Sequence, residues 1–427
     1  MFQFTGVDSL NEYQRKVTHV YGNEAEQMRF KWIYLILLSA LAIRLYYIFG
    51  NSFPPLAEDA MFYSKMAKQF LETGILGYNS TEPNSFVTPG FPLVLSAVYG
   101  LFGTAQLGFQ LTQVAFSVLT IWVVYRIAQK YLSETFSLIS AACMAIYPGF
   151  IYSNGLLLTE VTFTLLLASF LLLLLEGLQR GRSSILIAAG VLLGFSVLVR
   201  PTPAILVLPL VLYFAIQLPS KKLVFRALFY VGFSSFIVVL PWWIRNSLLF
   251  GEPVLFTTSG NNPLLWGVHP YSIGWENTFY SIYLMDTTEL ERNALWGDRA
   301  KEMFLSQLHQ AGFIKWFLIG KLNAFWRIPW VENGEIAHMF GKWRNPLHLL
   351  FVAGGWLGLM ASVWRKHAIA WLALVIVIYT IMHQIMLPIP RYAYPIMPYM
   401  IIFFCYGMSQ LYDAVNKGVT KENRHAL

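Results

Sequence analysis

The chain has 427 residues, of which 56% are hydrophobic and only 12% are charged. This composition excludes an ordinary soluble domain of the same length, and repeated apolar runs of about 20 residues indicate a polytopic helical membrane protein. The net charge of +8 is typical of cytoplasmic lysines and arginines that orient such a protein, rather than of a nucleic-acid-binding surface.

The apolar runs give the predicted elements in chain order. A polar arm (1–30) precedes the first run (31–50), which has no small-residue cleavage site after it and is predicted to be a retained span. Basic clusters mark cytoplasmic ends, so the number of crossings between them must be even. Two runs fail this test and are predicted to lie on the outer surface: 88–103, which opens with prolines, and 313–330, which basic residues interrupt. The ten remaining runs are the predicted spans: 31–50, 106–127, 134–151, 160–178, 183–199, 201–217, 227–244, 346–363, 368–387 and 394–412.

This topology predicts an all-α, multi-pass membrane protein with both termini cytoplasmic, short inner loops and two large outer loops. The second outer loop is long enough for a small cap but too short for a large independent domain. The predicted segments are the arm (1–30), a transmembrane core (31–252) that contains the first outer loop (51–105), the cap (253–345), the C-terminal spans (346–412) and a tail (413–427).

Ionisable side chains collect on the predicted outer face, whereas the inner face carries basic clusters with few acids. Two carboxylates, Glu58 and Asp59, directly follow the first span, and Glu160 opens the fourth. Three arginines and a histidine lie near the outer ends of later spans, and one arginine lies inside the first span. The candidate site residues are Arg44, Glu58, Asp59, Tyr63, Glu160, Arg200, Arg245, His383 and Arg391.

Each of these residues also has a purely structural interpretation. Asp59 suits the N-terminus of a helix that is expected to run to about Leu71 and stop at Gly74. Asp59 and Tyr63, four residues apart, share a face of that helix, whereas Glu58 faces water.

The other candidates have structural alternatives of the same kind. Glu160 also suits a helix cap, the arginines suit an interface, and His383 suits a core position with its polar atoms satisfied. Arg44 is costly inside a span unless it snorkels or is paired, so a partner such as Glu58 or Glu160 is expected.

Carboxylates beside arginines suit sugar transfer from a lipid-linked glycosyl phosphate. A carboxylate can take the proton of an acceptor hydroxyl, and arginine neutralises a leaving phosphate in fixed geometry. The sequence has no nucleotide-binding glycine loop, no Walker lysine motif and no His-Glu-x-x-His motif. Its two cysteines, Cys143 and Cys405, lie in apolar runs and predict neither a disulfide framework nor a thiolate metal site.

Four segments, all on the predicted outer face, follow one another in an order and spacing typical of a known family. They are Glu58-Asp59-Ala60-Met61-Phe62-Tyr63, Thr88-Pro89-Gly90-Phe91-Pro92-Leu93, Tyr147-Pro148 with Leu158-Thr159-Glu160, and Arg391-Tyr392-Ala393-Tyr394-Pro395. With these segments the chain resembles the GT-C membrane glycosyltransferases. The resemblance is to the family 39 branch, with protein O-mannosyltransferases and bacterial aminoarabinose transferases of lipid A. It covers about 30–300 and, locally, 390–400.

The resemblance implies a hexosyl- or pentosyltransferase of the cell envelope that uses a polyprenyl-phosphate-linked sugar, inverts the anomeric carbon and works at the outer face of the cell membrane. Its acceptor is a lipid, glycan or protein hydroxyl. It implies Asp59 as general base, Glu160 as the second catalytic acid, and Arg391 with Arg200 and Arg245 as ligands of the donor phosphate. Many relatives have Asp-Glu where this chain has Glu58-Asp59, so the resemblance leaves open which acid is the base.

The resemblance also leaves a divalent cation open, because some of these enzymes use one and others do not. Two further hypotheses remain beside it: a polyprenyl-phosphate or lipid carrier without sugar transfer, and a non-catalytic subunit of an envelope assembly. A carrier typically places polar groups at the bilayer midplane on broken helices and has repeated halves. Here the charges collect at one face and no repeat is evident.

Overall fold

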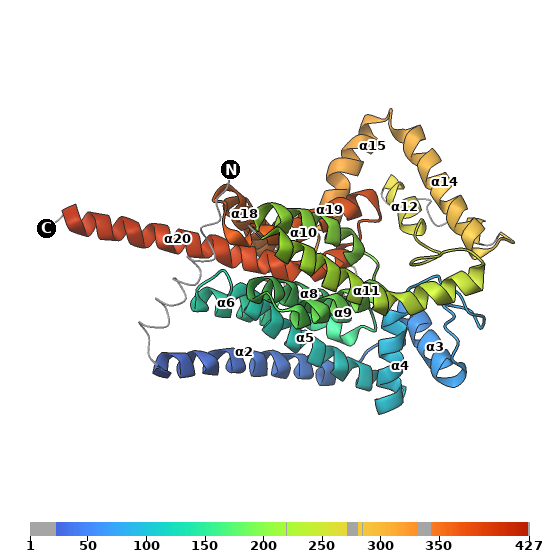
Figure 1. Cartoon of the computed structure of the whole chain (residues 1–427), viewed down its shortest axis with the longest axis horizontal. Helices are drawn as coiled ribbons and strands as arrows, with labels where there is room; N and C mark the ends of the chain where they lie inside the picture. The colour runs from blue at the N-terminus through green and yellow to red at the C-terminus, as the bar shows by residue number, and fades with distance from the viewer. Residues whose placement is uncertain (1–22, 219, 271–280, 284, 331–342, 426–427) are drawn as a thin grey trace.

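The computed structural model describes residues 23–218, 220–270, 281–283, 285–330 and 343–425 (Figure 1). Every regular element in these ranges is helical, which confirms the all-α class. The longer helices are α2 (Asn23–Gly50), α5 (Gln106–Ala128), α8 (Glu160–Arg180), α9 (Ser183–Val199), α11 (Lys221–Phe250), α18 (Arg344–Trp364), α19 (Trp371–Ile385) and α20 (Met397–His425).

The remaining elements join these helices or cover them, and most are shorter. They are α3 (Glu58–Thr73), α4 (Gly90–Phe102), α6 (Glu134–Ile146), α7 (Pro148–Tyr152), η1 (Ser153–Gly155), α10 (Pro203–Gln217), α12 (Asn262–Gly267), α14 (Glu289–Gln307), α15 (Ala311–Lys315), η3 (Trp316–Gly320), α16 (Lys321–Phe325), η5 (Ala368–Ala370) and η6 (Pro390–Ile396). In Figure 1 the long helices form one bundle, and α3, α4, α12, α14 and α15 gather at the same end of it.

Six helices in the described part of the chain are long and apolar enough to cross a membrane, or seven if the bent pair of α6 with α7 and η1 counts as one span. This range supports a multi-pass membrane protein but does not confirm the predicted count of ten. The apolar helices α9 and α10 have 17 and 15 residues, short of the about 20 that a span needs. Six of the predicted spans correspond to the six helices Lys31–Gly50, Gln106–Ala128, Glu160–Arg180, Lys221–Phe250, Arg344–Trp364 and Ala368–Ile385.

The predicted span 134–151 is bent by 57° between α6 and α7. Pro148 begins α7 and has no N–H to donate back to Met144, so the carbonyl groups at the end of α6 lose their helical partners. Arg44 of α2 supplies the missing donors: its guanidinium donates to Ala145 O at 3.1 Å and to Met144 O at 3.4 Å. Its Nε donates to Ser117 Oγ at 2.9 Å. Arg44 therefore caps a broken helix inside the bundle.

This arrangement corrects the expected partner of Arg44. The side chain is fully buried, yet its hydrogen bonds go to neutral groups rather than to Glu58 or Glu160. A buried guanidinium with its donors satisfied is a structural element, so we do not include Arg44 in the candidate site.

The first outer loop contains two helices, as predicted. α3 ends at Gly74, whose φ of 74° is the left-handed conformation that glycine adopts readily. α4 begins at Gly90, which packs so closely that an added Cβ would lie 2.6 Å from backbone atoms of Leu198. Thr88 fixes the same contact by donating to Val199 O at 3.2 Å. The loop is thereby joined to the end of α9, next to Arg200.

The predicted surface segment 313–330 is helical only in short pieces, α15, η3 and α16. Lys315 and Arg327 are exposed, as an amphipathic segment requires. Lys321 is fully buried, which the prediction did not anticipate. Burial lowers the pKa of Lys321 to about 7, and its ammonium donates to Gly267 O at 2.7 Å and Ile385 O at 3.2 Å. Lys321 therefore ties the cap to the end of α19.

Candidate functional site

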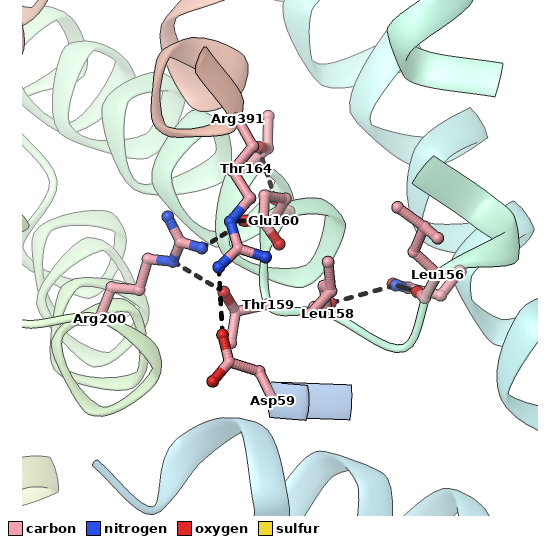
Figure 2. Close-up of polar contacts among 9 residues, drawn as sticks. Asp59, Leu156, Leu158, Thr159, Glu160, Thr164, Arg200 and Arg391 are labelled. Atoms are coloured by element: carbon pink, nitrogen blue, oxygen red, sulfur yellow. Dashed lines mark hydrogen bonds and ion pairs between the residues drawn. The ribbon is translucent and has the colours of Figure 1, made fainter. Parts of the chain in front are cut away.

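Four charged residues from four separate segments meet in one cluster (Figure 2). Asp59 lies in the first turn of α3, Glu160 opens α8, and Arg391 lies on η6. Arg200 is the C-cap of α9. The sequence predicted that these residues share one face, and the structure brings all four into a single network of ion pairs.

Glu160 is the buried centre of this network. Its side chain is 1% exposed, and its Oε1 accepts from Arg200 Nη2 at 2.7 Å. The same oxygen lies 3.8 Å from Arg391 Nε. A carboxylate is stable so far from water only when cations compensate its charge. Glu160 therefore holds two arginines beside each other that would otherwise repel.

Arg200 is fixed on three sides. Its Nε donates to Thr159 Oγ1 at 2.7 Å, and its guanidinium lies 5.2 Å from the ring of Tyr392 and 5.7 Å from that of Phe163. Burial by itself would lower the pKa of Arg200, but Glu160 and Tyr392 more than offset this and the pKa is raised. Arg200 is therefore held as a cation in an aromatic shell.

Asp59 is the accessible acid of the site. Its side chain is 44% exposed, and its Oδ2 accepts from Arg391 Nη2 at 3.1 Å. Arg391 is 23% exposed. Burial alone would lower its pKa, but Glu160, Tyr392 and Asp59 raise it. The network thus runs from Arg200 to buried Glu160, from Glu160 to Arg391, and from Arg391 to Asp59, the carboxylate that solvent can reach.

The chain around Glu160 is held from both sides. Gln113 of α5 donates from Nε2 to Leu156 O at 3.2 Å and to Leu158 O at 3.3 Å (Figure 2). Within α8, Thr164 donates to Glu160 O at 2.7 Å. These contacts fix the turn that aims the Glu160 side chain at the arginines.

Three other predicted residues lie around the network. Glu58 is exposed and has a φ of 49°. Tyr63 packs edge to face against Phe91, with ring centroids 5.0 Å apart. His383 donates from Nδ1 to Tyr379 O at 2.8 Å, and its ring lies 5.2 Å from Tyr392. His383 thus has the satisfied core position of its structural interpretation and supports the ring that faces Arg200.

Arg245 belongs to a different network. Its guanidinium donates to Ser85 Oγ at 2.7 Å, to Asn246 Oδ1 at 2.9 Å and to Asn84 O at 3.0 Å. Ser85 also accepts from the Thr258 backbone N–H, which links the first outer loop to the chain after α11. Arg245 therefore shapes the outer loops, and the structure does not bring it to the four-residue network.

Two residues that the sequence analysis missed contact the network directly. Thr159 Oγ1 accepts a hydrogen bond from Arg200 Nε, and the hydroxyl of Tyr78 donates to Asp59 Oδ1 at 2.7 Å. Thr159 adjoins Glu160, so its contact was open to inference. Tyr78 lies 19 residues from Asp59 in a loop without helical period, and no spacing rule connects the two.

The donor set does not suit a bound divalent cation in the arrangement seen. In the described ranges, no three His, Cys, Asp or Glu side chains converge as a metal site would require. The two acids present, Asp59 and Glu160, are each paired with an arginine. A divalent cation would have to displace a guanidinium from one of these carboxylates.

Residues 83–244 match the family model described as dolichyl-phosphate-mannose-protein mannosyltransferase. The chain is also similar in structure to the oligosaccharyltransferase of Archaeoglobus fulgidus. The apo form gives a TM-score of 0.55 at 16% identity, covering 92% of this chain and 52% of that one. The form tethered with an acceptor peptide gives 0.56 at 16% identity, covering 90% and 50%. At 16% identity, this likeness shows that the chain shares the fold of the archaeal enzyme.

A lower TM-score, 0.45 at 13% identity, relates the chain to ArnT from Cupriavidus metallidurans, solved bound to undecaprenyl phosphate, over 88% of this chain and 77% of that one. A comparison with curated proteins gives no match. The chain spans about half the length of the archaeal oligosaccharyltransferase. The family-model match contains Glu160 and Arg200, whereas Asp59 and Arg391 lie outside it on either side.

Proposed function

We propose that this protein is an integral-membrane glycosyltransferase that moves a sugar from a polyprenyl-phosphate donor to an acceptor hydroxyl, with inversion at the anomeric carbon. The observation that carries the proposal is the pairing of accessible Asp59 with Arg391, which is in turn held beside the buried Glu160–Arg200 pair. This places a proton acceptor next to a fixed cation, the two groups that the reaction needs.

The arginines supply the anion-binding part of the site. A glycosyl phosphodiester carries one negative charge, and the phosphate gains a second as the bond to the sugar breaks. Arg391 is partly exposed, and its guanidinium is poised to receive the phosphate oxygens. Arg200 lies behind it and adds to the positive field. The phosphate-binding role of Arg245 is not part of the proposal, because that guanidinium is engaged by the outer loop.

Asp59 is the proposed general base. It takes the proton of the acceptor hydroxyl while the oxygen attacks the anomeric carbon on the face opposite the phosphate, which gives inversion. Glu160 acts through the arginines: it is 1% exposed, so we assign it the role of holding Arg200 and Arg391 rather than of touching substrate. The predicted outer-face location and the range of acceptors (lipid, glycan or protein hydroxyl) belong to the same proposal.

The test is transfer by the purified protein in lipid nanodiscs, with a panel of polyprenyl-phosphate sugars and the membrane extract as acceptor. Asp59→Asn keeps the shape of the side chain and removes its basicity, so transfer should fall by about 10²-fold or more. Glu72→Gln removes another exposed acid from α3 and serves as the matched control. Full transfer by Asp59→Asn together with loss in Glu58→Gln would reassign the base to Glu58.

A further inference from the structure

The two carboxylate oxygens of Asp59 have different partners. Oδ2 faces Arg391 Nη2 at 3.1 Å, and Oδ1 accepts the hydroxyl hydrogen of Tyr78 at 2.7 Å. A carboxylate that accepts two directed hydrogen bonds, one on each oxygen, is fixed in orientation. Release of one of these contacts opens that oxygen to an incoming proton while the other contact keeps the group oriented.

Tyr78 is held far more rigidly than a loop residue needs to be. Its backbone N–H donates to Asn84 Oδ1 at 3.0 Å, and Asn84 Nδ2 donates back to Tyr78 O at 2.9 Å. The ring stacks on Phe86 with centroids 5.3 Å apart and an interplanar angle of 7°. The rings of Phe62 and Tyr63 pack against it edge to face. Tyr78 is 8% exposed, so its hydroxyl has little freedom to turn away from Asp59.

The environment also keeps the Tyr78 hydroxyl protonated. Burial raises its pKa, and the charge of Asp59 raises it further, so the phenol acts as a donor throughout the physiological range. The contact therefore has a defined direction, from tyrosine to carboxylate.

We propose that Tyr78 is a positioning residue that holds Oδ1 of Asp59 while Oδ2 serves as the proton acceptor. The inference rests on the proposed function and deepens it. Because Arg391 contacts Oδ2, a donor phosphate that draws the guanidinium away frees that oxygen and leaves the Tyr78 contact in place. The carboxylate then stays oriented during the step for which it is needed.

The step balances in atoms and charge. The bond from the acceptor oxygen to the anomeric carbon forms, and the bond from that carbon to the phosphate oxygen breaks. The hydroxyl proton moves to Asp59 Oδ2, and the electron pair of the broken bond remains on the polyprenyl phosphate, which Arg391 neutralises. Tyr78 keeps its own proton throughout.

Asp59 has several charged and titratable neighbours besides Tyr78. The titratable and charged groups that surround it are Glu58 and Tyr63 on α3, Tyr78 in the loop, Glu160 on α8, Arg200 after α9, and Arg391 and Tyr392 on η6. A substitution that changes only Tyr78 leaves the ion pairs of this set intact.

The experiment compares Tyr78→Phe with the control Tyr99→Phe. The Tyr99 hydroxyl also bonds a residue of α3, Ser64 at 2.8 Å, but it does not contact Asp59. Loss of the Tyr78 hydroxyl removes the hydrogen bond that orients the Asp59 carboxylate. In Tyr78→Phe only, kcat for transfer should therefore fall about tenfold with the donor KM unchanged.

An unchanged kcat would overturn the inference. A raised donor KM with an unchanged kcat would also overturn it and would make Tyr78 a donor ligand. Asp59→Asn is measured alongside. If Asp59→Asn is inactive and Tyr78→Phe behaves like Tyr99→Phe, the role of Tyr78 alone fails. If Asp59→Asn is fully active, the proposed base fails and the inference fails with it.

Discussion

The two ends of α8 each carry a glutamate among basic residues, and the arrangements differ. At the start, Glu160 is 1% exposed and lies 2.7 Å from Arg200. At the other end, Glu176 is 12% exposed and lies 3.5 Å from each of Arg126, Lys130 and Arg180. Both clusters are networks of ion pairs. The Glu160 network is buried and contains the shorter ion pair, whereas the ion pairs of Glu176 are longer and more accessible to water.

The difference distinguishes a candidate catalytic site from an anchor, a cluster of charges that only fixes a helix end at the membrane surface. Around Glu160 the arginines come from segments far apart in the chain, aromatic rings close the shell, and a second carboxylate, Asp59, lies at the accessible edge. Around Glu176 the basic residues are 35%, 16% and 49% exposed, and no second acid joins their ion pairs in the described part of the chain. Such a solvated cluster matches the basic ends that the topology prediction placed at the cytoplasmic face.

Replacing Glu160, the buried centre of the network, should have the largest effect on stability and transfer. Glu160→Gln leaves Arg200 beside Arg391 without its own counter-charge, in a buried position where breaking an ion pair costs about 3–5 kcal/mol. We expect a clear drop in the thermal midpoint in detergent and loss of transfer by about 10²-fold or more. Thr120→Val, which removes a helix-internal hydroxyl of α5 that bonds Phe116 O, is the control. Normal stability and transfer in Glu160→Gln would mean that the buried charge holds nothing together.

Replacing Arg391 tests donor binding with little expected effect on the stability of the fold. Arg391→Lys keeps the charge but loses the planar fork that grips a phosphate, and hydrogen bonds to charged groups contribute about 1.5–3 kcal/mol. We expect a 10- to 100-fold loss in kcat/KM for the donor with little change in stability, because Glu160 keeps Arg200 as its close partner. The measurement is a donor titration of Arg391→Lys beside Arg365→Lys, an arginine on the opposite side of the C-terminal spans that bonds Gln410. Equal donor kinetics in the two variants would contradict the phosphate role.

Much of the site follows from local rules in the sequence. The parity of basic clusters and the position of acids at helix starts predict Asp59, Glu160, Arg200 and Arg391 on one face, together with Arg245 and His383. The end of α3 at Gly74 follows from the same reasoning, because glycine tolerates the left-handed conformation that closes a helix. Such features depend on residues within a few positions of each other, or on the side of the membrane to which a segment returns.

The rest depends on tertiary geometry that no spacing encodes. Arg44 needed a partner, but the partner proved to be the carbonyl groups exposed by the bend at Pro148, which becomes visible only when α2 packs beside α6. Arg245 lies at the expected end of the bundle yet turns to the first outer loop. Tyr78 reaches Asp59 because the loop after α3 folds back, and loop paths have no periodicity to follow.

Replacing Glu176 is the mildest test and completes the comparison. Glu176→Gln leaves three partly exposed cations, and water and salt screen their mutual repulsion, so the expected loss of stability is about 1 kcal/mol or less. Transfer should remain within about twofold of the wild type, because Glu176 lies roughly 24 Å along α8 from Glu160 at a rise of about 1.5 Å per residue. The measurement is the thermal midpoint and transfer rate of Glu176→Gln beside Glu160→Gln at low and high salt. A loss of transfer as large as in Glu160→Gln would show that the two ends of α8 work as one site, and the distinction between site and anchor would be wrong.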